Sequence, residues 1–271
     1  MIELKKNEEQ LTNEVMGKIS LSKDKVNLEK HVVNLSKTVV DLSKKNGVDL
    51  GDTRAKVVVA LDYSGSMSGL YRRGVVQKTL NRLVPLGLTF DDNGSIDVYL
   101  FESGHRKFDD LTIENYDDYV EEVINKSGYS MGGTNYAGVL NDIVFGGTRT
   151  ETIQKKGLFG FGKKTVTTEV KGDAIVSDDQ PTFVIFITDG ENSDKRDTDD
   201  VIRRSSRENV FIQFVGIGNE RFRYLQELDN LDGRDRDNTG FVKLENLDTV
   251  SDNELYTSVL EQFVQWLRGE Q

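Results

Sequence analysis

The feature that most constrains the fold is a set of three apolar runs that lack polar alternation. They cover residues 57–61, 182–188 and 210–215 and are rich in Val, Ile and Phe. A strand with one wet face alternates apolar and polar residues, so runs of this kind are typical of a parallel sheet buried on both faces. A fourth run, residues 95–101, alternates more and is predicted to lie nearer an edge.

Amphipathic segments separate these runs. Apolar residues share one helical face in residues 76–84 and 136–143, and a last helix is predicted from Ser251 and Glu254, which stand in capping-box spacing. The alternation of strands and helices predicts an α/β fold with a doubly wound parallel sheet. Ligand sites in such sheets lie beyond the C-terminal ends of the strands.

Residues 1–50 form a distinct N-terminal extension with a seven-residue repeat. Copies start at Ile19, Val26, Val33 and Val40, and Val33 and Val40 widen the apolar stripe. The stripe itself alternates by four and three residues, as in a heptad seam: Leu28, Val32, Leu35, Val39 and Leu42. We expect a helix that ends at Asn46-Gly47. It either docks on its own domain or binds a partner or a second copy.

An insertion interrupts the α/β pattern at about residues 147–181. Two Thr-rich arms flank a Gly-rich tip, residues 155–164, which carries Phe159 and Phe161 between lysines. This pattern predicts an inserted β-hairpin. The tip could be a floppy insertion, a partner contact or, less favoured, a membrane contact.

The overall composition excludes several classes of function. Lys and Arg total 35 and Asp and Glu total 46, giving a net charge of −11, which argues against nucleic acid as a partner. There is no cysteine, so thiolate catalysis and Cys-type zinc sites are absent. No apolar run approaches the roughly 20 residues of a membrane span, and no secretory signal is visible, so a soluble cytoplasmic protein is expected.

Oxygen-bearing side chains gather where the predicted strands end or a helix is about to begin. The three segments are Asp62-Tyr63-Ser64-Gly65-Ser66-Met67, Gly132-Gly133-Thr134-Asn135 and Thr188-Asp189-Gly190. Hydroxyl and carboxylate oxygens suit a hard cation such as Mg²⁺. The alternative is that these residues only cap helices and turns, which explains each of them singly but not the set.

These three motifs resemble the metal-ion-dependent adhesion site (MIDAS) of von Willebrand factor A (vWA) domains. The resemblance covers about residues 54–267 and implies a Rossmann-like, mostly parallel six-stranded sheet, with the vWA domain at residues 51–271. It also implies a metal site of five residues: Asp62, Ser64, Ser66, Thr134 and Asp189.

The resemblance assigns a role to each of these residues. Ser64 and Ser66 would bind Mg²⁺ directly, and Thr134 would join them when a ligand is present; Mn²⁺ or Ca²⁺ could replace Mg²⁺. Asp62 and Asp189 would act largely through bound water, or exchange with Thr134. A protein partner would then donate an Asp or Glu carboxylate to the ion.

The flanking residues resemble TerF-type proteins more closely. The Leu-Ser-Lys repeats leading into residues 40–50, together with residues 57–67 and 183–192, are similar to this group of vWA proteins from bacterial and phage tellurium-resistance (ter) stress operons. This resemblance implies a protein-binding module in a stress response. The alternative is an assembly protein that oligomerises through its heptads, with the metal as a static brace.

No enzyme is expected. Only His31 and His105 could serve as an imidazole base, and neither stands in a recognisable catalytic motif. A phosphate-binding Gly-Lys-Ser/Thr motif is also missing.

Overall fold

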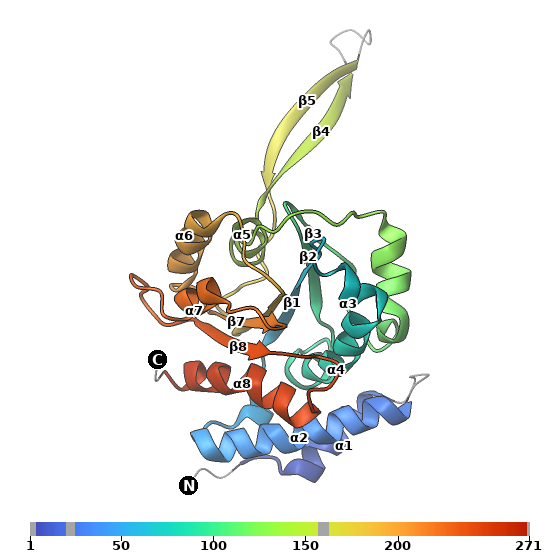
Figure 1. Ribbon diagram of the computed structural model, residues 1–271, viewed down its shortest axis with the longest axis vertical. Helices are drawn as coiled ribbons and strands as arrows, with labels where there is room; N and C mark the ends of the chain where they lie inside the picture. Colours follow the sequence, from blue (N-terminus) through green and yellow to red (C-terminus); the bar gives the residue numbers. More distant parts are fainter. Residues whose placement is uncertain (1–3, 20–24, 157–162, 270–271) are drawn as a thin grey trace.

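The sheet has six strands in the order β3-β2-β1-β6-β7-β8, and all neighbours pair in parallel except β2 and β3 (Figure 1). The structure, a computed structural model, describes residues 4–19, 25–156 and 163–269. The strands of this sheet are β1 (Lys56–Asp62), β2 (Asp97–Phe101), β3 (His105–Lys107), β6 (Thr182–Thr188), β7 (Val210–Ile217) and β8 (Thr239–Leu244). The predicted α/β sheet is therefore confirmed.

Helices cover both faces of this sheet. The α-helices are α1 (Glu8–Lys18), α2 (Lys25–Asn46), α3 (Ser68–Arg72), α4 (Val75–Phe90), α5 (Ala137–Phe145), α6 (Lys195–Ser205), α7 (Arg223–Asp229) and α8 (Asp252–Arg268). Short helical turns are η1 (Leu50–Asp52), η2 (Tyr116–Asp118), η3 (Val120–Ile124) and η4 (Asn125–Ser127). Helices α5, α6 and α7 pack on one face, while α4 and α8, with α1 and α2 outside them, pack on the other.

The central strand β1 shows why the apolar runs lack alternation. Val57 and Val59 point into the core beneath α4 and α8, whereas Val58 and Ala60 point into the core beneath α5 and α6. All four side chains are fully buried. The fourth run lies one strand in from the edge strand β3, which agrees with its predicted place nearer an edge.

The N-terminal extension docks on its own domain. All five seam residues of α2 are buried in the core that includes α4 and α8. A polar hub reinforces the contact: Asp252, the first residue of α8, lies 2.7 Å from His31 Nδ1 and accepts from Asn34 Nδ2 (2.9 Å) and Arg82 Nε (2.7 Å). The docked interpretation is therefore confirmed.

Two details of the extension differ from expectation. Val33 is 43% exposed and does not widen the buried stripe, because the helix turns it away from α8, whereas Val40 is buried. A separate helix, α1, precedes α2, and part of the first repeat copy, residues 20–23, lies outside the described residues. As predicted, α2 ends at Asn46, with Gly47 in the left-handed region at φ 70°.

The predicted hairpin is present and projects from the body (Figure 1). Strands β4 (Thr148–Lys156) and β5 (Lys163–Lys171) pair antiparallel, so the ribbon ends at residue 171 and not at 181. Residues 172–181 instead lead back to β6. Residues 157–162 of the Gly-rich tip lie outside the described residues, and the expected contacts of the tip stay predictions.

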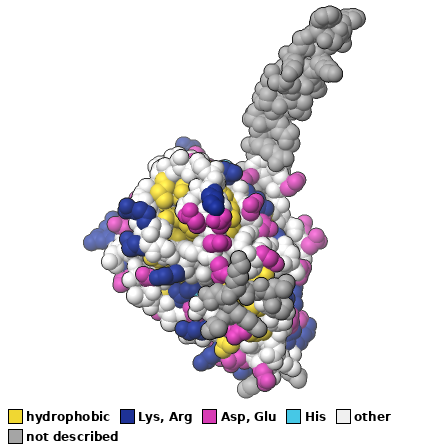
Figure 2. Space-filling view, turned by 90° about the vertical axis from the view of Figure 1, so that its right-hand side faces the viewer, with side chains coloured by type: hydrophobic (Ala, Val, Ile, Leu, Met, Phe, Trp, Pro, Cys, Tyr) yellow, Lys and Arg dark blue, Asp and Glu magenta, His cyan; other side chains and the backbone are white. Residues whose placement is uncertain are grey.

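The described surface is charged. Figure 2 shows acidic and basic side chains interspersed over one face of the body, with smaller apolar areas between them. Within the described residues, no helix is long and apolar enough to cross a membrane.

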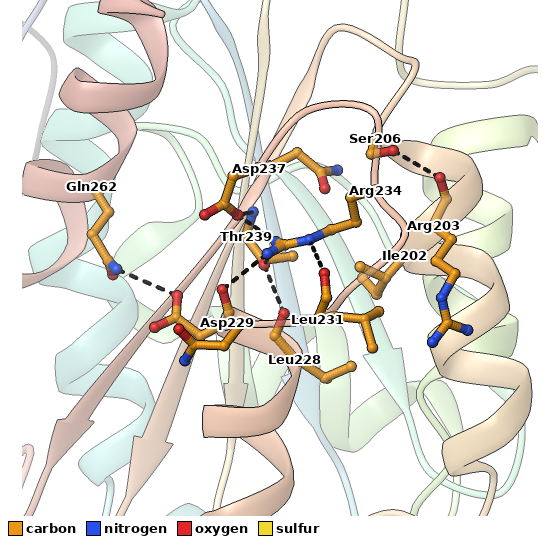
Figure 3. A network of polar contacts seen from close by, with 12 residues as sticks. Ile202, Arg203, Ser206, Leu228, Asp229, Leu231, Arg234, Asp237, Thr239 and Gln262 are labelled. Carbon is orange, nitrogen blue, oxygen red and sulfur yellow. Dashed lines mark hydrogen bonds and ion pairs between the residues drawn. The ribbon is translucent and has the colours of Figure 1, made fainter. Parts of the chain in front are cut away.

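A buried arginine organises the turn between α7 and β8 (Figure 3). Arg234 donates to the carbonyl oxygens of Leu231 (2.7 Å) and Asp229 (3.1 Å) and also bonds the Asp237 carboxylate and the Thr239 hydroxyl. The guanidinium thereby satisfies backbone acceptors that the end of α7 leaves open.

The carboxyl of Asp229 lies beside this arginine network and receives a hydrogen bond from Gln262 on α8 (3.4 Å; Figure 3). Burial, together with the negative charge of Asp237, raises its pKa to about 6. Ionisation of this carboxyl therefore works against folding near neutral pH.

The docking of α2 predicts a large stability effect for Leu35→Ala. Removing this fully buried side chain should lower the free energy of unfolding by about 2–5 kcal/mol. Val33→Ala, the exposed neighbour on the same helix, should change it by less than about 0.5 kcal/mol. Urea unfolding of both variants measures the difference; equal midpoints would contradict the docked arrangement.

The raised pKa of Asp229 predicts a pH-dependent gain for Asp229→Asn. The folded-state pKa of about 6 lies above the ordinary value of 3.8, so wild-type stability falls as pH rises between these values and stays lower above them. Because Asp229 is partly exposed, we expect the variant to be more stable by only about 1 kcal/mol at pH 8. The gain should vanish near pH 4. Urea unfolding at both pH values tests this, and a gain of equal size at both would refute it.

Candidate metal centre

The first motif starts at the buried end of the central strand. Asp62 is the last residue of β1, and its side chain is 0% exposed. One carboxylate oxygen accepts from the backbone N–H of Ser64 (2.8 Å), and the other accepts from the Thr188 hydroxyl at the end of β6 (2.6 Å). These bonds fix Asp62 beneath the loop that carries both serines.

Hydroxyl groups connect this loop to the third motif. The Ser64 and Ser66 hydroxyl oxygens lie 3.0 Å apart, and Ser66 donates to Asp189 Oδ1 (2.8 Å). Because β1 and β6 are parallel neighbours, Asp62 and Asp189 follow at the same edge of the sheet. The structure therefore brings together four of the five predicted residues.

The fifth residue, Thr134, comes from a neighbouring loop. Gly132 forms a parallel bridge with Ser64, and its carbonyl oxygen accepts from Gly65 N (3.1 Å). Thr134 itself is half-buried, and its carbonyl oxygen accepts from Ser193 N (2.9 Å). Within the part of the chain that the structure describes, its hydroxyl makes no hydrogen bond to the other four side chains.

Asp194 is a positioning residue that the sequence did not reveal. Its two carboxylate oxygens accept from the backbone N–H groups of Tyr136 (2.9 Å) and Ala137 (2.8 Å), the start of α5, directly after the Thr134 loop. Tyr136, at the N-cap, offers no side-chain cap of its own. Asp194 therefore supplies the missing acceptors and ties the Thr134 loop to the Asp189 loop.

Among the described residues, the two carboxylates of the site have no basic partner. Burial raises the pKa of Asp62 to about 6, against the hydrogen bonds from Ser64 and Thr188, and burial also raises the pKa of Asp189. No described Lys or Arg forms an ion pair with either carboxylate. A divalent cation would supply the missing positive charge.

The donor set fits a hard cation. Two carboxylates and three hydroxyls are oxygen ligands of the kind that Mg²⁺ prefers. The described residues hold no cluster of three or more His, Asp or Glu suited to a metal. A cation at this centre would therefore depend on the serine and threonine hydroxyls as well as on the two carboxylates.

Comparison with known proteins identifies the family. A family model described as the vWA domain found in the TerF C terminus matches residues 54–271. The chain belongs to this TerF-like vWA family. YcbR of Bacillus subtilis (strain 168) is 33% identical over 216 residues, which cover 79% of this chain and 78% of YcbR. The predicted vWA and TerF-type resemblance is thereby confirmed.

Solved structures show the same fold at low sequence identity. Proximal thread matrix protein 1 from the mussel byssus superposes with a TM-score of 0.50 at 15% identity, covering 79% of this TerF-like chain and 49% of that protein. The chain thus spans about half the length of the mussel protein. A structure of the same mussel protein with a zinc-occupied MIDAS motif gives a TM-score of 0.49 at 18% identity and covers 47% of it.

The double cap by Asp194 predicts that Asp194→Asn weakens metal binding. The amide keeps the shape but turns one acceptor into a donor that faces a backbone N–H, so the Thr134 loop should loosen. We expect Mg²⁺ or Mn²⁺ affinity to fall by about 10- to 100-fold, as for other groups that orient metal ligands. Titration calorimetry measures it, with circular dichroism to confirm folding.

The matched control for this change is Asp197→Asn. Asp197 is an exposed carboxylate in the first turn of α6, three residues away. Its substitution should leave metal affinity unchanged. Wild-type affinity in folded Asp194→Asn would show that Asp194 does not position the site.

Proposed function

We propose that this protein is a non-enzymatic, Mg²⁺-dependent module that binds a protein partner through the partner's Asp or Glu carboxylate. The observation that carries the proposal is the hydrogen-bonded chain from Asp62 through Ser64 and Ser66 to Asp189, with the Thr134 loop beside it. This arrangement gathers oxygen donors at one edge of the sheet, where α/β proteins bind ligands.

The chemistry of the donors favours a site that is completed from outside. In the proposal, Ser64 and Ser66 hold the ion directly, Thr134 joins when the partner binds, and Asp62 and Asp189 act largely through water. Neutral hydroxyl ligands leave the cation electrophilic, so a partner's carboxylate is a strong additional ligand. Mn²⁺ or Ca²⁺ could occupy the same donors.

The surroundings of the two histidines support the non-enzymatic part of the proposal. His31 is held against Asp252 between α2 and α8, a contact that joins the extension to the body. His105 Nε2 lies 3.5 Å from Asp142 Oδ2 on α5. Among the described residues, no serine or threonine hydroxyl is hydrogen-bonded to either ring, so neither histidine stands in a Ser-His type of catalytic arrangement.

We place the module in a tellurite-resistance or stress-response (ter) system, and membership of the TerF-like family supports this placement. The acidic net charge of −11 favours protein partners over nucleic acid.

The burial of the α2 seam argues against the alternative of an assembly protein. The heptad seam of α2, on which a second copy would pack, is buried within the same chain. We therefore expect the 271-residue protein to elute as a monomer in size-exclusion chromatography with light scattering. A concentration-independent dimer or larger assembly would revive the alternative.

The proposal predicts that Ser64→Ala/Ser66→Ala abolishes metal binding. Removing two direct ligands should weaken Mg²⁺ or Mn²⁺ by more than the roughly 10- to 100-fold effect of a supporting residue. Ser68→Ala, one residue beyond the metal loop, is the matched control and should bind metal normally. Titration calorimetry of purified protein measures all three.

Partner binding is tested by affinity capture with the purified protein as bait, once in Mg²⁺ and once in EDTA. A specific partner should be retained by wild type in Mg²⁺ and lost both in EDTA and with Ser64→Ala/Ser66→Ala. A partner that stays bound in both conditions would rule out metal-dependent recognition.

A further inference from the structure

A hollow of about 680 Å³ opens directly beside the metal centre. Ser66 and Asp189 form one side of it. The other side is formed by the loop between β7 and α7, with Arg221 and Phe222, and by Arg223 at the start of α7. Any segment that reaches the metal from this side must lie along that loop.

The loop is held in one conformation by Phe222. This residue has φ 48°, the one non-glycine residue with positive φ among those described. Its ring is 2% exposed and packs on Gly216, where a Cβ atom would come within 2.9 Å of the ring. A strained residue locked by packing is typical of functional loops, because the surrounding structure must over-determine it.

The buried Phe222 is flanked by two arginines that line the hollow. Arg221 and Arg223 are both exposed, and neither guanidinium forms an ion pair with a described residue. Two unpaired cations beside one hollow are notable in a chain of net charge −11. They create a local site for anions on an otherwise acidic protein.

Two further acidic residues line the hollow, one on each side. Glu191 follows the Asp189 loop and is paired with Lys195 (2.8 Å), whereas Glu220 belongs to the β7–α7 loop, and its negative charge contributes to the raised pKa of Asp189. A bound divalent cation would offset the negative charges of Asp189 and Glu220, while no described carboxylate forms an ion pair with either arginine. With the cation bound, the hollow would therefore have two positively charged positions that can bind an anion: the cation and the two arginines.

We propose that this hollow is a second recognition point for the protein partner, in which Arg221 and Arg223 bind a second carboxylate of the same acidic segment. The inference rests on the proposed function, because the first carboxylate completes the metal centre. Guanidinium groups match carboxylates through paired N–H donors, which gives orientation as well as attraction. The module thus selects segments with two acidic residues over segments with one.

Synthetic peptides test this selection at saturating Mg²⁺ and constant ionic strength. Hexaglutamate offers pairs of side-chain carboxylates at several spacings. A C-terminally amidated peptide of the same length with one Glu and five Gln residues offers a single carboxylate, and hexaglutamate is amidated in the same way. Wild type should bind hexaglutamate about tenfold more tightly, the size expected for a charge-assisted hydrogen bond. Arg221→Gln/Arg223→Gln should lose most of this preference, because only the larger number of carboxylates that can reach the metal then favours hexaglutamate.

The matched control is Arg207→Gln. Arg207 precedes β7, at the opposite end of the strand from the loop, and its ion pair with Asp235 is exposed. It should keep the tenfold preference, and no variant should bind Mg²⁺ more weakly than wild type does. Weaker Mg²⁺ binding by the double variant would assign the arginines to the metal centre itself and overturn the inference.

The outcomes separate the two proposals. If the double variant keeps the preference while EDTA abolishes binding, the inference is wrong and the metal-dependent function stands. If wild type binds neither peptide, or binds hexaglutamate equally well in EDTA, both are wrong. Inorganic phosphate that displaces hexaglutamate but leaves the single-Glu peptide bound would assign the hollow to a phosphoryl group instead.

Discussion

The burial of β1 on both faces is the constraint on which the rest of the structure depends. A central strand with no wet face requires helices on both sides, and parallel neighbours require crossovers that place consecutive loops at one edge. Asp62 and Asp189 meet because β1 and β6 are such neighbours. The meeting of the candidate metal ligands Asp62 and Asp189 is therefore a consequence of strand order, and the local sequence supplies the oxygen-bearing side chains where these strands end.

The N-terminal helices add a further layer outside the helices that cover the sheet. Helix α8 covers the sheet with one face and would expose the other, and α2 buries that second face with its heptad seam. Asp252 adds direction to the contact, because a carboxylate at the start of α8 meets His31, Asn34 and Arg82 from two other helices. The apolar stripe of α2 determines which helix faces pack together, and the polar contacts of Asp252 determine how α2 is aligned along α8.

The sequence was informative wherever the determinant is local. Apolar runs predicted β1, β2, β6 and β7, and the heptad stripe predicted the helix α2, whereas nothing in the sequence analysis marked β3 or β8. Short motifs predicted which loops would converge. It failed where two distant segments meet: Asp194 caps α5 across 57 or 58 residues, and no local pattern marks such a pair. The left-handed Phe222 was equally hidden, because a phenylalanine gives no signal of positive φ. Val33 belongs to the seven-residue repeat and was expected to widen the buried stripe, but its side chain is exposed. The repeat alone does not show how wide a face the helix buries.

At the base of the hairpin, the two ends of the inserted segment contact each other. The ribbon leaves and re-enters the body at one point, where Gly172 N donates to Gly147 O (2.7 Å), and Gly146 leaves no room for a side chain against Gly172. Because the two ends already touch, lengthening or shortening the ribbon adds little loop-closure entropy and moves no core residue. We therefore expect the length and sequence of the hairpin to tolerate change, whereas packing restricts substitutions in the sheet and in the loops of the candidate metal centre.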